Sequence, residues 1–286
     1  MIRLFFICSL ALALHAYCMN AQEVDTSTFP RVSIPGTEIR YIRSSIVGDE
    51  FKIYIALPTN YRSTDTTYPV LYFPDANVSF AAVTQIARLM QLGNGLPQII
   101  FVGIGYQSAD SVSKWWELRI RDLTPIYDSS ERGGGGAAKF LRFIREELMP
   151  FINKNYRTSA DASYAGYSGG GLFGLYVLFH EPDTFQRYII GSPSIWWGNL
   201  VTLKYEADYA TKHPNLSARV FMSVGELEER ADTTSKMVTN MKQLAKKLLS
   251  RRYTSLHLQT IVFDGETHLS GFSIAICRGL RVIYQK

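Results

Sequence analysis

From residue 58 onward, short apolar segments of strand length alternate with amphipathic segments of helix length. The predicted strands cover residues 69–73, 98–104, 163–166, 185–191, 218–224 and 256–263. The predicted helices cover residues 80–92, 137–153, 171–180, 200–212 and 233–250, and a last helix begins at residue 270. Because parallel strands need long crossover connections, this alternation predicts a mostly parallel sheet with helices on both faces.

Two β-rich stretches, residues 38–46 and 50–57, precede this pattern and flank the turn-like Val47-Gly48-Asp49. They predict an antiparallel hairpin at the N-terminal edge of the sheet. The sequence contains no internal repeat and no inter-domain linker, and no large cap domain is expected. Residues 22–286 are therefore predicted to form a single α/β domain.

The longest stretch predicted to be irregular covers residues 106–136 and ends in Gly133-Gly134-Gly135-Gly136. A loop of that length in a compact domain is usually functional or mobile. The glycines do not form a phosphate-binding loop, because no Lys-Ser/Thr pair follows them. We interpret them as a flexible hinge before the helix at residue 137.

The first 21 residues follow the order of a secretory signal peptide. Arg3 gives a positive start, residues 4–16 form an apolar run, and Ala21 offers a cleavage site. The run is too short to predict a membrane span, so we expect export without stable membrane insertion after cleavage. Cys18 raises the alternative of a lipoprotein anchor. Simple secretion is favoured, because Tyr17 is bulkier than the small residue that usually precedes a lipidated cysteine.

Cleavage after residue 21 would leave Cys277 as the one cysteine of the mature chain, which excludes an internal disulfide. Export without disulfides favours a bacterial periplasm as the destination. Cys277 lies in an apolar run, and we interpret it as a small core residue.

The formal net charge of +5 is small for 286 residues, and the basic residues are scattered. A nucleic-acid partner is not expected, since it would favour a basic stripe or patch. The sequence has no paired histidines, no cysteine cluster and no HExxH motif, so no metal is predicted. Gly103-Ile104-Gly105 lacks the third glycine of a dinucleotide fingerprint, and no cofactor is predicted. The oligomeric state is not readable from the sequence.

The segment Gly166-Tyr167-Ser168-Gly169-Gly170 follows a short apolar strand and opens a glycine-rich apolar helix. This strand–turn–helix setting is typical of a nucleophilic serine in a G-x-S-x-G turn. Small residues two positions before and after the serine let the strand and helix pass closely. The backbone amide of Gly169 is then a candidate donor to a developing oxyanion.

A serine nucleophile needs a base, and the base needs a carboxylate that orients it. His268 lies in a loop after the last predicted strand, where this chain order places the base. Three glutamates follow the next-to-last strand, and we favour Glu228 as the acid over Glu226 and Glu229.

A second oxyanion donor is expected in the loop after the 69–73 strand. The backbone amides of Ala76 and Asn77 are the candidates there.

These residues resemble the esterase D-like branch of the α/β-hydrolases, which includes feruloyl esterases and siderophore esterases. The matching segments are residues 68–75, 119–125, 136–148, 156–157, 165–172, 192–197, 225–228 and 265–268. The resemblance implies an α/β-hydrolase fold, with Ser168 as nucleophile, His268 as base and Glu228 as acid.

Two positions depart from the pattern of this branch. Tyr167 stands where histidine is common, and Gly169 stands where leucine or methionine is common. Gly169 keeps its backbone donor. The absence of a side chain at this position changes the pocket and therefore the choice of substrate.

The sequence thus predicts a serine carboxylic-ester hydrolase that works through an acyl-enzyme on a small-molecule ester. The resemblance favours a siderophore lactone ester. Candidate substrate-binding residues are Arg119, Arg121, Tyr167, Trp196 and Trp197, which suit an anionic, aromatic ligand. The alternative for the two arginines is that they brace the loop through Asp122.

Two alternatives for the function stay open. One is a feruloyl or acetyl esterase, or an acyltransferase, that acts on saccharide esters. The other is a non-catalytic binding protein on a hydrolase scaffold, because a fold alone does not determine activity.

Overall fold

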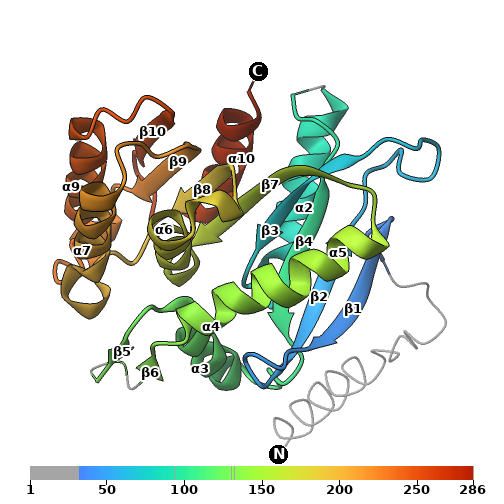
Figure 1. Cartoon of the computed structure of the whole chain (residues 1–286), viewed down its shortest axis with the longest axis horizontal. Helices are drawn as coiled ribbons and strands as arrows, with labels where there is room; N and C mark the ends of the chain where they lie inside the picture. Colours follow the sequence, from blue (N-terminus) through green and yellow to red (C-terminus); the bar gives the residue numbers. More distant parts are fainter. Residues whose placement is uncertain (1–31, 94, 130, 132, 286) are drawn as a thin grey trace, which may run out of the picture. The chain divides into compact units, whose positions relative to one another are not determined.

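The central sheet has eight strands within the described residues, which are 32–93, 95–129, 131 and 133–285 of a computed structural model. The strand order is β1-β2-β4-β3-β7-β8-β9-β10 (Figure 1). These strands are β1 (Thr37–Arg43), β2 (Glu50–Ala56), β3 (Tyr68–Phe73), β4 (Ile100–Tyr106), β7 (Thr158–Tyr167), β8 (Arg187–Gly191), β9 (Ala218–Gly225) and β10 (Leu256–Phe263). The pairs β1–β2 and β2–β4 are antiparallel, and the other neighbours are parallel. The predicted parallel sheet with an antiparallel N-terminal edge is confirmed.

The helices follow the strands in the predicted alternation. They are α2 (Ala76–Leu92), α3 (Val112–Leu123), α4 (Ala137–Arg142), the π-helical η2 (Phe143–Leu148), α5 (Met149–Asn155), α6 (Gly169–His180), the 3₁₀ turn η3 (Pro182–Thr184), α7 (Trp197–Lys212), α8 (Glu228–Ala231), α9 (Met237–Ser250) and α10 (Gly271–Tyr284). Two short strands, β5 (Tyr127–Asp128) and β6 (Gly133–Gly134), form a separate antiparallel ribbon. All these elements belong to the unit Gly36–Lys286, and the predicted signal peptide lies outside the described residues.

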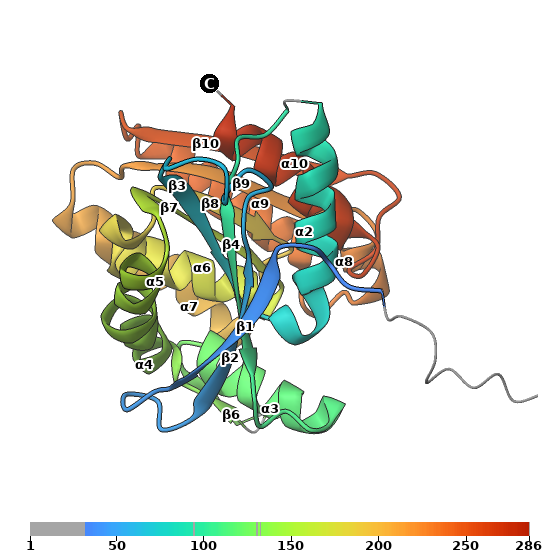
Figure 2. The same ribbon diagram turned by 90° about the vertical axis from the view of Figure 1, so that its right-hand side faces the viewer.

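Alternating side chains of the strands build a core on each face of the sheet. On β3, Leu71 and Phe73 pack with α2 and α10, whereas Val70 and Tyr72 belong to the core on the opposite face. Figure 2 shows α2 and α10 on one side of the sheet and α4, α5 and α6 on the other. The strands of the parallel part are therefore apolar on both sides, as their continuous hydrophobic sequence predicts.

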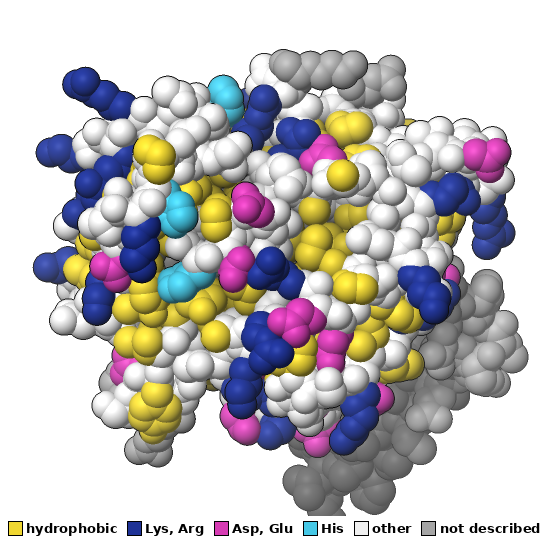
Figure 3. Space-filling view, viewed as in Figure 1, with side chains coloured by type: hydrophobic (Ala, Val, Ile, Leu, Met, Phe, Trp, Pro, Cys, Tyr) yellow, Lys and Arg dark blue, Asp and Glu magenta, His cyan; other side chains and the backbone are white. Residues whose placement is uncertain are grey.

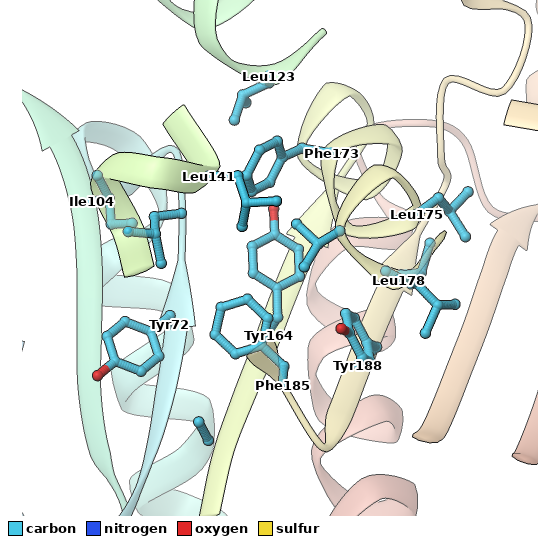
Figure 4. Packing of buried hydrophobic residues seen from close by; sticks show 14 of the residues in the cluster. Tyr72, Ile104, Leu123, Leu141, Tyr164, Phe173, Leu175, Leu178, Phe185 and Tyr188 are labelled. Carbon is cyan, nitrogen blue, oxygen red and sulfur yellow. The ribbon is translucent and has the colours of Figure 1, made fainter. Parts of the chain in front are cut away.

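The core beneath α6 supports the turn that precedes this helix. The ring of Tyr164 on β7 packs against Phe173, Phe185 and Tyr188 (Figure 4). Its hydroxyl donates a 2.7 Å hydrogen bond to the carbonyl of Gly170, at the start of α6. A buried hydroxyl needs such a partner, and this bond ties the core to the Ser168 turn.

The prediction of a wholly irregular segment over residues 106–136 is wrong, because helix α3 occupies its middle. Ser111 caps the helix by accepting a hydrogen bond from the backbone amide of Lys114. Leu118 and Leu123 face the core, while adjacent polar and aromatic residues obscure this periodicity in the sequence.

The four glycines, interpreted from the sequence as a flexible hinge, lie in close contact with the end of α3. The amides of Gly135 and Gly136 donate to the carbonyls of Thr124 and Arg121, at the end of α3. Gly134 has φ +102° and lies so close to Thr124 that a Cβ atom would overlap its hydroxyl. Gly134 and Gly135 permit this close packing because both adopt a positive φ, which glycine allows at little cost.

Cys277 is exposed on α10, which corrects its interpretation as a core residue. The neighbouring Ala275 and Ile276 occupy the buried positions of the helix. The apolar run in the sequence therefore includes residues from both faces of an amphipathic helix.

On the face drawn in Figure 3, the described Lys and Arg side chains are interspersed with acidic and hydrophobic ones. Over the part of the chain that the structure describes, no helix combines the length and apolar character that a membrane crossing requires.

We predict that Gly134→Ala lowers the free energy of unfolding by about 3 kcal/mol or more, because it adds overlap to a left-handed backbone. Gly48 in the β1–β2 turn is a matched control, since it has φ +83° and no atom within 4 Å of its Cβ position. Gly48→Ala is expected to cost about 1–2 kcal/mol, from backbone strain alone. Urea unfolding of both variants measures the difference. Equal losses would show that the space around Gly134 is not restricted.

Candidate active site

The carboxyl ends of β7, β8, β9 and β10 meet at one edge of the sheet. In register, Tyr167 pairs with Gly191, and Gly191 pairs with Ser223. Loops that leave neighbouring parallel strands on this edge are the usual place for a ligand site in open α/β sheets. The loops after these strands carry Ser168, Ser192, Glu228 and His268.

Ser168 occupies the strained turn between β7 and α6. Its φ and ψ are 58° and −119°, a conformation that non-glycine residues rarely adopt. A Cβ atom at Gly166 would overlap the carbonyl of Gly170, so strand and helix pass within backbone contact. Ser168 is fixed by its amide, which donates to the carbonyl of Gly191 at 2.9 Å. This geometry is the one predicted from the G-x-S-x-G sequence.

The Ser168 hydroxyl lies beside a second hydroxyl. Ser168 Oγ is 3.4 Å from Ser194 Oγ, and the Ser194 amide donates to the Ser168 carbonyl at 3.2 Å. Ser168 and His268 line the same cavity, which the nucleophile and its base must share. Hydrogen bonds between such groups are often long in a free enzyme and shorten when substrate binds.

The side chains of His268, the predicted base, and Glu228, the predicted acid, are in direct contact. His268 Nδ1 lies 2.7 Å from Glu228 Oε2, and Glu228 is only 4% exposed. Burial raises the pKa of Glu228, but hydrogen bonds from His268, Ser192 and the Gly225 amide outweigh it and lower this pKa below its ordinary value. An ionised Glu228 can only accept, so the Nδ1–H group of His268 donates to it. The Nε2 atom of His268 is then left able to accept a proton.

The two competing glutamates have other partners. Glu226 accepts from Arg230 and from the amide of Gly265. Glu229 accepts from the hydroxyl and the amide of Thr239 on α9. Of the three candidates, the structure brings Glu228 to His268.

The candidate oxyanion donors lie at two helix N-termini. Gly169 is the first residue of α6, and Ala76 and Asn77 are the first two of α2. The amide N–H groups in the first turn of a helix have no partner within the helix and can donate to a bound anion. The Asn77 side chain is engaged elsewhere, since it exchanges two hydrogen bonds with the backbone of Tyr106 on β4. Its amide stays a candidate by position.

The main cavity next to Ser168 has a volume of about 410 Å³. It is lined by Asp75, Val78, Ser79, Ala82, Trp115, Trp116, Arg119, Tyr167, Ser168, His268, Leu269 and Phe272. The lining is mostly apolar and aromatic, with a few charged groups, which is typical of a small-molecule site.

Arg119 is the cationic group of this cavity, although it is only 6% exposed. Its Nε donates to Asp75 Oδ1 at 2.9 Å, and its Nη2 donates to the Tyr167 carbonyl at 3.1 Å. The guanidinium also lies 5.6 Å and 5.3 Å from the ring centroids of Trp115 and Trp116. Arg119 therefore braces the Ser168 turn and forms part of the cavity wall.

The structure places the other predicted substrate-binding residues at different locations, and only some of them line a cavity beside Ser168. Arg121 forms ion pairs with Asp122 and Asp49, and the structure does not bring it into the cavity lining. Trp197 is buried and donates to the carbonyl of Ile126. Trp196 lines a second cavity of about 230 Å³, whose walls include Ser168 and His268. The Tyr167 ring lines the main cavity.

The sequence analysis missed three residues of this site: Asp75, Ser192 and Ser194. Ser192 and Ser194 directly follow the end of β8, so the rule that loops after parallel strands form the site could have found them. Asp75 follows the end of β3 by two positions, so the same rule could have found it, but its pairing with Arg119, 44 positions away in the sequence, carries no local signal. Within the described residues, no group of three or more His, Cys, Asp or Glu side chains could hold a metal ion.

Comparison with known proteins identifies the family. The model of the family described as "Putative esterase" matches residues 44–281. The chain belongs to this esterase family. It is 34% identical to the ferri-bacillibactin esterase BesA of Bacillus subtilis, over 87% of this chain and 90% of that protein. It is 28% identical to a siderophore triacetylfusarinine C esterase of Aspergillus fumigatus, over 89% of this chain and 95% of that protein.

A comparison with solved structures finds a similar fold. The crystal structure of the BES protein from Bacillus cereus superimposes with a TM-score of 0.78 at 30% identity, and covers 90% of this chain and 99% of that one. The predicted α/β-hydrolase fold and the predicted activity, that of a serine esterase, are confirmed at the level of the family.

We predict that Glu228→Gln lowers kcat by roughly a thousandfold, because the amide cannot stabilise the imidazolium or select the same tautomer. Glu226→Gln and Glu229→Gln are matched controls in the same loop, and each should change kcat by less than about threefold. Hydrolysis of a chromogenic short-chain ester measures all three. A loss of kcat in Glu226→Gln that equals the loss in Glu228→Gln would contradict this assignment.

Proposed function

We propose that this chain is an exported esterase that hydrolyses ferric siderophore esters, with Ser168 as nucleophile, His268 as base and Glu228 as the orienting acid. The observation that carries the proposal is the contact of His268 with buried Glu228 at the rim of the cavity that holds the strained Ser168. A strained, half-buried serine that lines a cavity with a histidine paired to a carboxylate is the arrangement that acyl transfer needs.

The chemistry follows from the positions of the groups. Ser168 Oγ attacks the ester carbonyl while its proton passes to His268 Nε2, and Glu228 stabilises the resulting imidazolium. The carbonyl oxygen becomes an oxyanion, which the amide of Gly169 and an amide at the start of α2 can hold. The intermediate collapses when His268 returns the proton to the leaving alcohol, which leaves an acyl group on Ser168. Water, deprotonated by His268, then releases the acid and restores the Ser168 hydroxyl.

Two observations support a siderophore ester as the substrate. Two relatives that match over most of their length are named esterases of ferri-bacillibactin and of triacetylfusarinine C. The cavity offers Trp115 and Trp116 with Arg119 between them and the nucleophile, which suits a bulky, anionic, aromatic ligand. An ester of a saccharide is the second candidate, since a ferulic acid esterase shares the fold at 14% identity.

We further propose export through the sequence of residues 1–21, with a bacterial periplasm as the destination. The order of a positive residue, an apolar run and a small residue supports this assignment.

We predict that Ser168→Ala and His268→Ala each abolish ester turnover, with a loss of about 10⁵-fold or more in kcat. A fluorophosphonate probe should label the wild-type chain at Ser168 and leave Ser168→Ala unlabelled. Full esterase activity in Ser168→Ala would refute the proposed nucleophile. An unlabelled, inactive wild-type chain would favour a non-catalytic binding protein.

The substrate class is tested by assaying ferric siderophores, feruloylated sugars and short acyl esters in parallel. We predict that Trp116→Ala raises KM for a ferric siderophore ester by roughly tenfold, through lost ring contact, and leaves kcat for a short acyl ester unchanged. Tyr41→Ala on β1 is the control, because Tyr41 is 54% exposed, close to the 48% of Trp116, and lies outside the cavity lining. Higher kcat/KM for feruloylated sugars would select the saccharide-ester alternative.

A further inference from the structure

Tyr167, the residue before the nucleophile, lies in a slot that two glycines create. A Cβ atom at Gly191 would overlap the Tyr167 ring, and one at Gly271 would lie 3.0 Å from the Tyr167 hydroxyl. The ring packs edge-on against Phe272, with centroids 5.4 Å apart, and lies 5.3 Å from the His268 ring. These contacts around the ring and at the hydroxyl fix the orientation of the Tyr167 side chain.

The Tyr167 hydroxyl reaches a chain of hydrogen bonds that ends at Glu228. Tyr167 Oη is 2.8 Å from Ser192 Oγ, and Ser192 Oγ is 2.6 Å from Glu228 Oε1. A serine hydroxyl has one proton, and an ionised carboxylate can only accept. Ser192 therefore donates to Glu228 and accepts from Tyr167, which makes the order Tyr167 to Ser192 to Glu228.

Glu228 is held on both of its oxygens by this arrangement. Oε1 accepts from Ser192 and from the Gly225 amide at 2.7 Å, and Oε2 faces His268 Nδ1. Removing one of these donors weakens the hold on the buried carboxylate and changes its charge distribution toward His268.

Ser192 itself adopts a backbone conformation that costs free energy. Its φ is +38°, and the residue is 1% exposed. Its amide donates to the carbonyl of Ser223 at 2.7 Å, which fixes the backbone in this conformation. Strain of this kind in a non-glycine residue persists where the surroundings determine it, and it is concentrated at functional sites.

We propose that Ser192 and Tyr167 are positioning residues for catalysis, which act in series through their hydroxyls to orient Glu228 toward His268. This inference rests on the proposed function of Ser168, His268 and Glu228. Tyr167 thereby connects the nucleophile turn to the acid, so the turn and the acid are set in place together.

The test is a double-mutant cycle with a chromogenic short acyl ester, in which kcat is expressed per site titrated by a fluorophosphonate probe. We predict that Ser192→Ala lowers kcat by about tenfold and Tyr167→Phe by about threefold, because a hydrogen bond to a charged group is lost directly or weakened. KM should stay within about twofold of wild type, because Ser192 does not line the main cavity and Tyr167→Phe keeps the aromatic ring.

Residues that act in series give non-additive effects. The double variant Tyr167→Phe with Ser192→Ala should match Ser192→Ala alone within about twofold. In a Glu228→Gln background, Ser192→Ala should cause no further loss of kcat. If Ser192→Ala does not fold, Tyr167→Phe measured with and without Glu228→Gln tests the same order.

The chain offers a matched control in a second tyrosine–serine pair. The Tyr284 hydroxyl donates to Ser163 Oγ at 2.9 Å, from α10 to a fully buried position on β7. Tyr284→Phe and Ser163→Ala should lower the unfolding temperature without changing kcat per titrated site.

Two results would overturn the proposal. One is an unchanged kcat per titrated site in both Ser192→Ala and Tyr167→Phe, with a loss of stability alone. The other is additive effects in the double variant, which would mean that the two hydroxyls act separately. Failure of the proposed function is distinct from both, because it would appear as an unlabelled wild-type chain or an active Ser168→Ala.

Discussion

The close passage of β7 and α6 at Ser168 is the constraint on which the site depends. A Cβ atom at Gly166 would overlap the carbonyl of Gly170, so only glycine allows the strand to turn directly into the helix. This turn imposes the φ of 58° at Ser168 and places its hydroxyl at the carboxyl edge of the sheet. In the core beneath the turn, the hydroxyl of Tyr164 donates a hydrogen bond to the carbonyl of Gly170. This contact helps to offset the free energy that the strain costs.

The turn determines the position of the serine, and the parallel sheet determines which residues it meets. Each neighbouring strand ends at the same edge, so β8 supplies Ser192 and Ser194, β9 leads to Glu228, and β10 leads to His268. Ser168 and His268, 100 positions apart in the sequence, thereby line one cavity. Because the loops are attached to rigid strands, their side chains can keep the short distances that proton transfer requires.

Local signals explain which features could be predicted from the sequence. Strand β10 has the predicted bounds, and the Ser168 turn could be recognised because strand, small residues and helix occur within a few positions. Glu228 was favoured over Glu226 and Glu229, and the family resemblance implied the same residue, although three glutamates within four positions give little local reason to prefer one. The structure distinguishes them by partner, because only a fold that brings residue 268 beside residue 228 creates that contact.

The features that could not be predicted involve tertiary contacts between segments without a pattern of their own. Helix α3 was missed because Trp115, Trp116 and charged residues interrupt its apolar face, and packing against the core decides its conformation. The glycine run is similar, since Gly134 is required by its contact with Thr124 and not by any local turn motif. Propensity in such segments is weak compared with tertiary packing.

The two departures from the family pattern have a common physical explanation in their neighbours. A Cβ atom at Gly169 would lie 2.8 Å from Nη1 of Arg119, so glycine at this position lets the guanidinium lie against the nucleophile turn. Tyr167, in turn, needs the absence of side chains at Gly191 and Gly271. Gly169 is therefore coupled to Arg119, and Tyr167 is coupled to Gly191 and Gly271. A leucine at position 169 would have to displace Arg119 from its hydrogen bond to the Tyr167 carbonyl, and that loss would reach the cavity and the turn together. The identity of residues 167 and 169 thus links the shape of the substrate cavity to the support of the nucleophile.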